Sequence, residues 1–450
     1  MSVEFKKHWD HYYRHYTTLS QFQIDVMVLL TIASVLSLGL GRALAQSGVI
    51  SPLVQACPGY SNNTDVVCIN RYASAMPPSF ERQSSTGGVF SPNDTFVETQ
   101  VPSDPSFGLV KNATFVVFDQ RGSQILGPSP KLESVFASRN DSIHEGPVYV
   151  PSLDAIIFSL PHQGIYQQQI IHLNGSTPRL ENYTTTPPVY AVNGGKLFNG
   201  KIYWAVEAGF SFPSPQNDSL VAQRPGIYEL DPSTGEVTIL LNNYFGQAFN
   251  SPNDLWVDDQ GDIWFTDSWY GYAINVTVYP VLRPATYRFR PSTGRVSIVE
   301  DSIAQPNGIG MSPDRRTMYI SDTGVTDFEN YPADGPLPRY SYNSLGGNSL
   351  YAFDVVVSPV GSYIVNKRPI YQAQTFGDDG FHVAQNGYLI AAEGGGVTVL
   401  SEYGEMLLRI ETGFTVNNIQ FAGPERKDLW VFGEGEIARV TWDLVGMANE

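Results

Sequence analysis

The stretch Asn253-Asp-Leu-Trp-Val-Asp-Asp-Gln-Gly-Asp-Ile-Trp-Phe-Thr-Asp267 decides the fold of this chain. Two short apolar and aromatic runs flank the polar run Asp258-Asp-Gln-Gly-Asp262, whose composition is typical of a turn. The stretch therefore predicts a β-hairpin. Positions symmetric about the turn face each other in a hairpin, so Asn253 and Asp267 are expected to be neighbours at its open end.

The same unit recurs along the chain. A polar residue begins an apolar strand, a turn follows, and a second apolar strand ends in an acidic residue 14 or 15 positions later. The clear copies run from Asn193 to Glu207, from Asn253 to Asp267, from Asn307 to Asp322 and from Asp379 to Glu393. Residues 145–159 and 418–434 are weaker first and last copies. Such regular spacing is typical of one supersecondary unit used repeatedly.

Six such units predict an all-β fold, a six-bladed β-propeller over residues 106–450. The outer turn Asp231-Pro-Ser-Thr-Gly-Glu-Val237 recurs as Arg290-Pro-Ser-Thr-Gly-Arg-Val296. Residues 115–119 are expected to supply the strand that completes the C-terminal blade and closes the ring. The 41 glycines, 31 prolines and 16% of charged residues fit short strands joined by tight turns.

The N-terminal region predicts secretion. Lys6, Lys7 and Arg14 precede an apolar run over residues 26–41, and Ala43-Leu44-Ala45 follows as a cleavage site. Residues 1–45 are therefore expected to be a signal peptide. An uncleaved type II signal anchor is the alternative, although the run is shorter than the roughly 20 residues of a membrane span. Eight Asn-X-Ser/Thr triplets support a secreted glycoprotein; they begin at Asn62, Asn93, Asn112, Asn140, Asn174, Asn182, Asn217 and Asn275.

Residues 46–105 are rich in Ser, Pro, Asn and Gly and are expected to form an N-terminal arm. Cys57 and Cys68 are the two cysteines of the chain, and an oxidising compartment would let them form a local disulfide. The net charge of −17 argues against nucleic acid as a partner, because nucleic-acid binding selects basic surfaces. No membrane contact is expected once the signal peptide is removed.

The starts of the first strands are expected to converge on the central channel of the propeller. These positions all offer oxygen ligands: Glu145, Asn193, Asn253, Asn307, Asp379 and, less clearly, Asn418. Hard oxygen donors with few charges suit Ca²⁺ or another divalent cation, whereas zinc prefers Cys or His. A single Asn before a strand more often caps a turn. Five such residues in register nevertheless predict an ion site.

The common hydrolase motifs are missing from the sequence. It has no G-x-S-x-G elbow, no H-E-x-x-H helix and no phosphate-binding loop. The single His-Glu pair, His144-Glu145, lacks a second His. Serine-nucleophile and zinc-protease chemistry are therefore not expected.

In these motifs the chain resembles the senescence-marker-protein/gluconolactonase family of calcium-dependent propellers, and most of all its fungal lactonohydrolases. The resemblance covers roughly residues 110–440 and is strongest in Leu-Leu-Asn-Asn-Tyr-Phe-Gly (240–246), Asn-Ser-Pro-Asn-Asp-Leu (250–255), Trp-Phe-Thr-Asp (264–267), Gln-Pro-Asn-Gly-Ile-Gly (305–310) and Asp-Gly-Phe-His (379–382). It implies that the metal ligands are Glu145, Asn253, Asn307 and Asp379, and that Asn193 lines the pocket. Many members have an Arg two positions before the ligand Asn, where this chain has Ser251.

The resemblance implies a secreted, calcium-dependent lactonase that opens a sugar-type or related γ- or δ-lactone, a small-molecule substrate, by attack of water. Asp379 is expected to be both ligand and general base, with His144 and His382 as rival bases. Four carboxylates are expected to orient the ligands: Glu207, Asp267, Asp322 and Glu393. The pocket walls are expected to include Asp267, Trp269, Tyr270 and Phe381.

Three alternatives stay open on the sequence alone. A calcium-dependent propeller can hydrolyse aryl esters or phosphotriesters, because the metal polarises a phosphoryl oxygen equally well. A secreted propeller can also be a non-enzymatic binding module with a structural ion. A metal-free propeller similar to strictosidine synthase is the third alternative, against which the carboxylates of Glu145 and Asp379 count.

Overall fold

The computed structural model describes most of the chain after the N-terminal region. The described residues are 52–60, 65–82, 95–137, 143–161, 168–209, 211–213, 220–329, 331–332, 334–358, 361–375 and 377–448. The expected signal peptide and the triplets at Asn62, Asn93, Asn140 and Asn217 lie outside them. Within the described part, no helix is long and apolar enough to cross a membrane.

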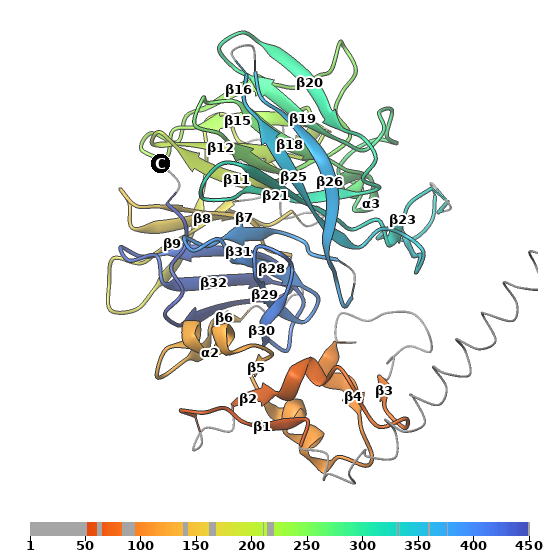
Figure 1. Cartoon of the computed structure of the whole chain (residues 1–450). Helices are drawn as coiled ribbons and strands as arrows, with labels where there is room; N and C mark the ends of the chain where they lie inside the picture. Colours follow the sequence, from red (N-terminus) through yellow and green to blue (C-terminus); the bar gives the residue numbers. More distant parts are fainter. Residues whose placement is uncertain are drawn as a thin grey trace, which may run out of the picture. The chain divides into compact units, whose positions relative to one another are not determined.

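The chain is an all-β propeller with few helices (Figure 1). The described residues form five sheets of four antiparallel strands each. In chain order these are β7 (Glu145–Val150), β8 (Ala155–Ser159), β9 (Gln168–His172) and β10 (Arg179–Tyr183); β11 (Val192–Phe198), β12 (Lys201–Val206), β15 (Gly226–Leu230) and β16 (Val237–Leu241); β17 (Pro252–Val257), β18 (Ile263–Asp267), β19 (Ala285–Arg290) and β20 (Arg295–Glu300); β21 (Pro306–Met311), β22 (Thr317–Asp322), β25 (Ser349–Val356) and β26 (Tyr363–Gln372); and β31 (Val416–Ala422), β32 (Asp428–Gly433), β33 (Glu436–Thr441) and β6 (Lys131–Ala137).

The expectation of six like blades is wrong, since five sheets of the described chain have the four-stranded form. The remaining repeat belongs to a seven-stranded sheet, which consists of β27 (Phe381–Val383), β28 (Leu389–Glu393), β29 (Gly396–Leu400), β30 (Met406–Glu411), β5 (Phe115–Val117), β2 (Val66–Ile69) and β1 (Val54–Ala56). The sheet is larger because β5 covers the outer edge of β30 and β2 then pairs in parallel with β5.

The strand that completes the C-terminal sheet is β6, not the segment 115–119. Lys131 pairs with Thr441 and Ala137 with Glu436 along β33. The sequence of β5, Phe-Val-Val, is buried throughout, as suits an interior strand between β30 and β2. The residues of β6 are instead partly exposed, as suits an outer strand. The difference in burial between the two segments thus distinguishes the interior strand β5 from the outer strand β6.

Smaller elements complete the described part of the chain. The short strands pair as β3 (Glu81–Arg82) with β4 (Thr99–Gln100), β13 (Ser211–Pro213) with β14 (Leu220–Ala222), and β23 (Thr326–Asp327) with β24 (Ser341–Tyr342). The helices are η1 (Asn70–Ala73), η2 (Phe96–Glu98), η3 (Pro105–Asn112), α2 (Gln120–Leu126) and α3 (Tyr270–Ala273). Cys57 and Cys68 form a disulfide next to the β1–β2 pair.

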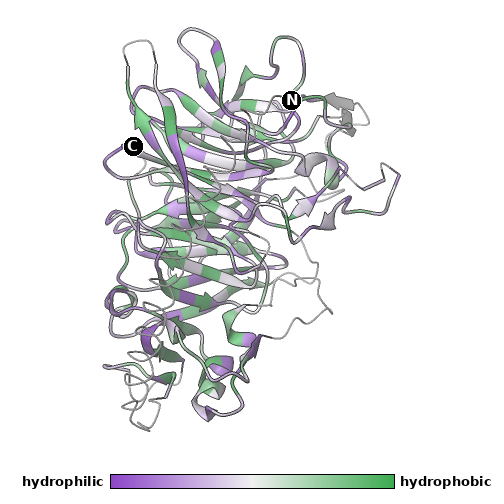
Figure 2. Ribbon diagram, turned by 45° about the vertical axis from the view of Figure 1, so that its right-hand side comes forward, coloured by the Kyte–Doolittle hydropathy of each residue, from purple (hydrophilic) through white to green (hydrophobic). Residues whose placement is uncertain are grey.

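The core lies between neighbouring sheets, where hydrophobic residues follow the strands (Figure 2). Trp204, Trp264 and Trp430 are among the largest fully buried side chains, and each sits in a second strand that packs against a neighbouring sheet. Truncating such a residue to Ala typically costs about 3–5 kcal/mol. The apolar side chains that alternate along the repeats therefore form the packing surface between the sheets.

The first strands form the centre of the ring. Each packs against the next, with contacts of β7 on β11, β11 on β17, β17 on β21, β21 on β27, β27 on β31 and β31 on β7. The backbones come very close: a Cβ on Gly194 would lie 2.5 Å from the carbonyl oxygen of Asn253. A Cβ on Gly308 would lie 2.6 Å from that of Asp379. Glycine after the ligand position allows this approach.

Five first strands pair irregularly with their second strands at the inner end. The register shifts lie between Glu145 and Val148, Val192 and Gly194, Pro252 and Leu255, Pro306 and Ile309, and Val416 and Asn418. A β-bulge leaves a residue outside the regular ladder and changes the direction of its side chain. These bulges coincide with the polar residues that the sequence analysis singled out.

Candidate metal and substrate site

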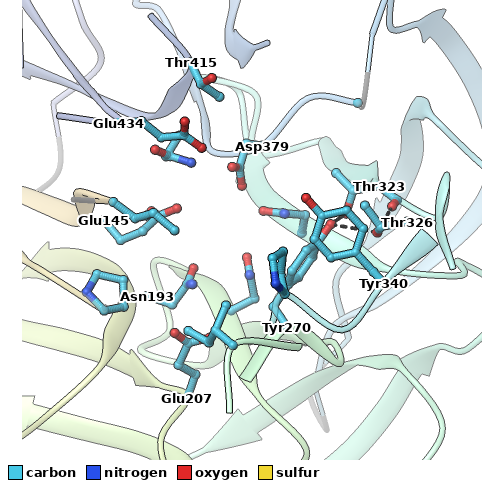
Figure 3. Close-up of a pocket in the computed structure, with 18 of the residues that line it drawn as sticks. Glu145, Asn193, Glu207, Tyr270, Thr323, Thr326, Tyr340, Asp379, Thr415 and Glu434 are labelled. Atoms are coloured by element: carbon cyan, nitrogen blue, oxygen red, sulfur yellow. Dashed lines mark hydrogen bonds between the residues drawn. The ribbon is translucent and has the colours of Figure 1, made fainter. Parts of the chain in front are cut away.

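The starts of the first strands line a single cavity of about 620 Å³ (Figure 3). Glu145 begins β7, Asn193 lies at the start of β11, and Asn253 and Asn307 lie at the starts of β17 and β21. Asp379 comes two residues before β27. The structure therefore brings the four predicted metal ligands and Asn193 together, although they come from five different sheets.

Glu145 is held from the neighbouring strand. The Nδ2 of Asn418 donates a hydrogen bond of 2.9 Å to the Oε2 of Glu145. Burial raises the pKa of Glu145 well above its usual value, and repulsion from Asp379 raises it further. Asn418 thus supports a predicted ligand from the side, and it is Asn417 that lines the cavity. The sequence analysis placed Asn418 itself in the channel and was one residue off, because the bulge in β31 reverses the direction of neighbouring side chains.

Asp379 is fixed by backbone and side chains together. Its N–H donates to the carbonyl of Ala392 at 2.9 Å, and its carboxylate accepts hydrogen bonds from the side chains of Asn307 and Asn417. Burial raises the pKa of Asp379 to about 7, and the charges of Asp254 and Glu434 act in the same direction. Two side-chain amides thus hold a carboxyl group at the cavity, where it can exchange a proton with water.

The carboxylates at the ends of the second strands hold the loops that lead into the ligand strands. Asp267 accepts hydrogen bonds from the backbone N–H groups of Asn250 (3.1 Å) and Ser251 (2.6 Å). Asp322 accepts from the N–H of Gln305 at 3.0 Å. Glu393 accepts from the backbone N–H of Gln374 in the same way. These three contacts repeat one design, in which a buried acid fixes the chain just before a cavity residue.

Glu207 departs from that design because it lines the cavity itself. The hydroxyl of Ser251 donates to its Oε2 at 3.1 Å, and the side chain of Asn193 also binds it. Burial raises the pKa of Glu207 to about 8. Ser251 in turn accepts the N–H of Gly271 at 2.8 Å. The position at which the resemblance implies an Arg thus carries a fully buried Ser that links β17 to α3 and to Glu207.

The opposite wall carries hydroxyl groups that bind one another. Tyr270 donates its phenol hydrogen to the Oγ1 of Thr323 at 2.7 Å and lies 3.0 Å from the Oγ1 of Thr326. Thr326 donates to the carbonyl of Thr323 at 2.5 Å, and Thr323 donates to the carbonyl of Gln305 at 3.2 Å. Figure 3 shows this wall, with Tyr340 beside it, across the cavity from Glu145 and Asn193.

Both predicted histidine bases lie outside the cavity lining. His144 is buried against Phe158, with its Nδ1 donating to the carbonyl of Gly433 at 2.5 Å. His382 is half-buried and lines, with Lys196, a separate cavity of about 10 Å³, large enough for about one water molecule. Burial lowers the pKa of both imidazoles, so each is neutral near neutral pH. In position, only Asp379 among the three candidate bases adjoins the main cavity.

Three predicted wall residues also lie outside the cavity lining. Phe381 packs over Gly308 and Gly310 beneath the cavity, where its ring fills the space left by the missing side chains. Trp269 is held by its N–H to Gln305 and contacts Phe328, behind the lining residue Tyr270. Asp267 is fully buried below the lining. Tyr270 is the one predicted aromatic wall residue that adjoins the cavity.

The sequence analysis missed several lining residues. Glu434 adds a further carboxylate, and Thr323, Thr326, Tyr340 and Thr415 add polar groups. Glu434 had a signal, since it ends the last repeat in the position of Glu207 and Glu393. The threonines and Tyr340 had none, because they lie outside the repeated hairpins, with Thr326 in the short strand β23.

The donor set fits a calcium ion. The four predicted ligands are two carboxylates and two amides, all oxygen donors of the type that Ca²⁺ prefers. Within the described part of the chain, no group of three or more His, Cys, Asp or Glu side chains is arranged to hold a metal ion. Among the described lining residues there is no Lys, Arg or His to balance the carboxylates. A bound divalent cation would supply that balance.

Comparison with known proteins places this chain in a family. The family model described as the SMP-30/gluconolactonase/LRE-like region matches residues 143–433. The chain belongs to this family. The matched region contains the four candidate ligands, whereas β6 and the strands that enlarge the seven-stranded sheet precede it.

Individual relatives agree with the family assignment. The chain is 42% identical to lactonohydrolase oryL of Aspergillus oryzae over 88% of this chain and 89% of that protein. It is 38% identical to lactonohydrolase oryH of the same fungus over 90% of this chain and 97% of that protein. Among solved structures, a gluconolactonase of Xanthomonas campestris superposes with a TM-score of 0.57 at 21% identity, covering 72% of this chain and 94% of that one. The last likeness shows the fold alone.

Proposed function

We propose that this protein is a calcium-dependent lactone hydrolase and that its reaction takes place in the 620 Å³ cavity. The observation that carries the proposal is the convergence of Glu145, Asn253, Asn307 and Asp379, from four sheets, on one cavity without a basic lining residue in the described chain. The similarity to two lactonohydrolases over most of the chain supports the choice of reaction.

Calcium is proposed as the metal, with those four residues as its protein ligands. When bound, a calcium ion supplies a Lewis acid that polarises the lactone carbonyl and balances the charge of the oxyanion. The remaining coordination positions of Ca²⁺, which takes six to eight oxygens, are left for water and substrate.

The protein groups then move the proton. Asp379 takes a proton from the attacking water, whose oxygen bonds to the carbonyl carbon. The ring C–O bond breaks, and the ring oxygen receives the proton back from Asp379, so the product is an open hydroxy acid. Asn307 and Asn417 hold the carboxylate of Asp379 in place during this exchange. Glu207 and Asn193 bind each other at the cavity wall and orient the substrate.

We further propose that the ring has six blades, with β27–β30 of the seven-stranded sheet as one of them. This count follows the closed order of contacts among the first strands. Secretion after cleavage at Ala45 is also proposed. The disulfide and the exposed asparagines of the described triplets support it: Asn112, Asn174, Asn182 and Asn275. N-terminal sequencing of the secreted protein tests the cleavage, and an N-terminus before residue 46 would contradict it.

The function is tested with purified protein and a panel of γ- and δ-lactones. Hydrolysis is followed by acid release, before and after dialysis against EDTA, and bound calcium is measured by elemental analysis. We expect chelation to abolish hydrolysis and added calcium to restore it. Hydrolysis that survives complete calcium removal would disprove the metal role. Failure to open any lactone with calcium bound would disprove the lactonase assignment.

A further inference from the structure

The cavity has an apolar side whose chemistry bears on the substrate. Ile143, Pro161, Ile274, Leu337 and Pro338 line it together with the metal-site residues. Leu337 is 41% exposed at the mouth, so part of its apolar surface faces solvent in the free protein. Covering apolar surface with a ligand contributes roughly 25 cal/mol per Å². A substrate that reaches this side gains most if its own surface there is hydrocarbon.

The loop that carries Leu337 is anchored so that its basic residue lies away from the cavity. The N–H of Arg339 donates to the carbonyl of Ala273 at 2.9 Å, and its guanidinium lies 5.0 Å from the ring of Tyr272. Arg339 is not among the lining residues, although Pro338 and Tyr340 on either side of it are. The mouth therefore presents apolar and aromatic groups, although the same loop contains Arg339.

Three hydroxyls of the hydroxyl-bearing wall already donate to partners within the protein. The hydroxyl hydrogens of Tyr270, Thr323 and Thr326 are directed to Thr323 Oγ1, to the Gln305 carbonyl and to the Thr323 carbonyl. A hydroxyl group has one hydrogen to donate. Sites that recognise a polyhydroxylated substrate depend on polar groups that pair with its hydroxyls. These three hydroxyls therefore donate within the protein, and Tyr340 lies beside them (Figure 3).

The charge of the cavity also selects against anions. The lining includes the carboxyl groups of Glu145, Glu207, Asp379 and Glu434, and no Lys, Arg or His lies among the described lining residues. A carboxylate or phosphate on the substrate would therefore find no basic side chain of the described lining to pair with.

We infer that the lactone is uncharged and carries an apolar alkyl or aryl substituent, which lies against Ile274, Leu337 and Pro338. This inference rests on the proposed lactonase function and names its substrate class. It distinguishes this protein from a hydrolase of sugar lactones, because a polyol chain would lose its water contacts on the apolar side, where three hydroxyls of the adjoining wall already donate within the protein.

The test compares lactones that share a six-membered ring. kcat/KM is measured with calcium present for δ-valerolactone, for δ-decalactone with its pentyl chain, and for D-glucono-δ-lactone with its hydroxyls. We expect δ-decalactone to exceed each of the others by at least about tenfold. A preference for D-glucono-δ-lactone would overturn the inference and leave the lactonase function standing. Failure of all three lactones would instead refute the function itself and the inference with it.

A pair of variants on one loop locates the substituent. Leu337→Asn is expected to lower kcat/KM for δ-decalactone about tenfold and for δ-valerolactone less than about twofold, because only the former carries the chain. Leu345→Asn is the matched control; Leu345 is 93% exposed and lies outside the cavity lining, so it should change neither value. Ile274→Asn gives a second probe of the same wall. Equal losses for both lactones in Leu337→Asn and Ile274→Asn would contradict the placement.

Discussion

The first strands have one face toward the large cavity and one toward the small cavity, and the two faces differ in how their charges are balanced. On the cavity face, Glu145 is buried and Asp379 is partly buried, and neither has a basic neighbour among the described lining residues. On the opposite face, the buried ammonium of Lys196 lies 4.0 Å from the ring of Trp256 and offsets the charge of Asp254. The cavity on the first face has a volume of about 620 Å³, and the cavity on the opposite face has a volume of about 10 Å³.

The same strands supply both faces. Asn253 lines the cavity, and its neighbour Asp254 lines the small space beneath. On β11, Asn193 likewise lines the large cavity and Lys196 lines the small one. Successive residues of a strand point to opposite faces, and the bulges shift which residue is selected. The comparison teaches that polar residues lie on both faces, whereas the described acids that lack a basic lining neighbour lie on the cavity face.

The sharpest contrast is between Asp379 and His382, three residues apart on opposite faces. Asp379→Asn is expected to lower kcat about 10³-fold, because the proposed proton acceptor is lost. His382→Gln is expected to change kcat less than about threefold. Steady-state kinetics on one lactone measures both. A large loss in His382→Gln, with Asp379→Asn still active, would show that the base lies on the other face.

The next contrast uses adjacent residues. Asn253→Ala is expected to weaken calcium binding at least about 100-fold, since groups that only orient ligands already contribute 10- to 100-fold. Asp254→Asn should alter calcium affinity less than about threefold, while it lowers the thermal midpoint because a hydrogen bond to the N–H of Ile309 is weakened. Calorimetric titration with calcium and thermal unfolding separate the two effects. Equal losses of affinity would mean that both faces form one site.

The smallest effect concerns the stability contributed by the lower face. Burial lowers the pKa of Lys196 from 10.5 to about 7, so between these values the unfolded chain binds more protons than the folded one. Stability from this residue therefore rises with pH above about 7 and is lost as the pH falls. Relative to Lys196→Met, the wild type should gain about 1 kcal/mol of unfolding free energy per pH unit between about pH 7 and 9. Urea unfolding at several pH values measures the difference in unfolding free energy. A difference that does not change with pH would contradict the lowered pKa of Lys196.

Much of the fold and site was predictable because both follow from a repeated local pattern. The hairpins beginning at Asn193, Asn253 and Asn307 and the strand start at Asp379 were read from apolar alternation and turn composition. The shift from Asn418 to Asn417 was not predictable, since a bulge has no reliable signature in a single sequence. The cavity positions of Thr323 and Tyr340 were equally hidden, because irregular turns depend on what they pack against.

The sequence by itself determined the repeated hairpins and the order of the oxygen-bearing residues along them, because strand periodicity and turn chemistry are local properties. Tertiary structure alone decided which strand closes the ring, which face each polar side chain occupies, and that both histidines lie outside the main cavity. These outcomes depend on pairing and burial between segments far apart in the chain, whose free energies no local pattern contains.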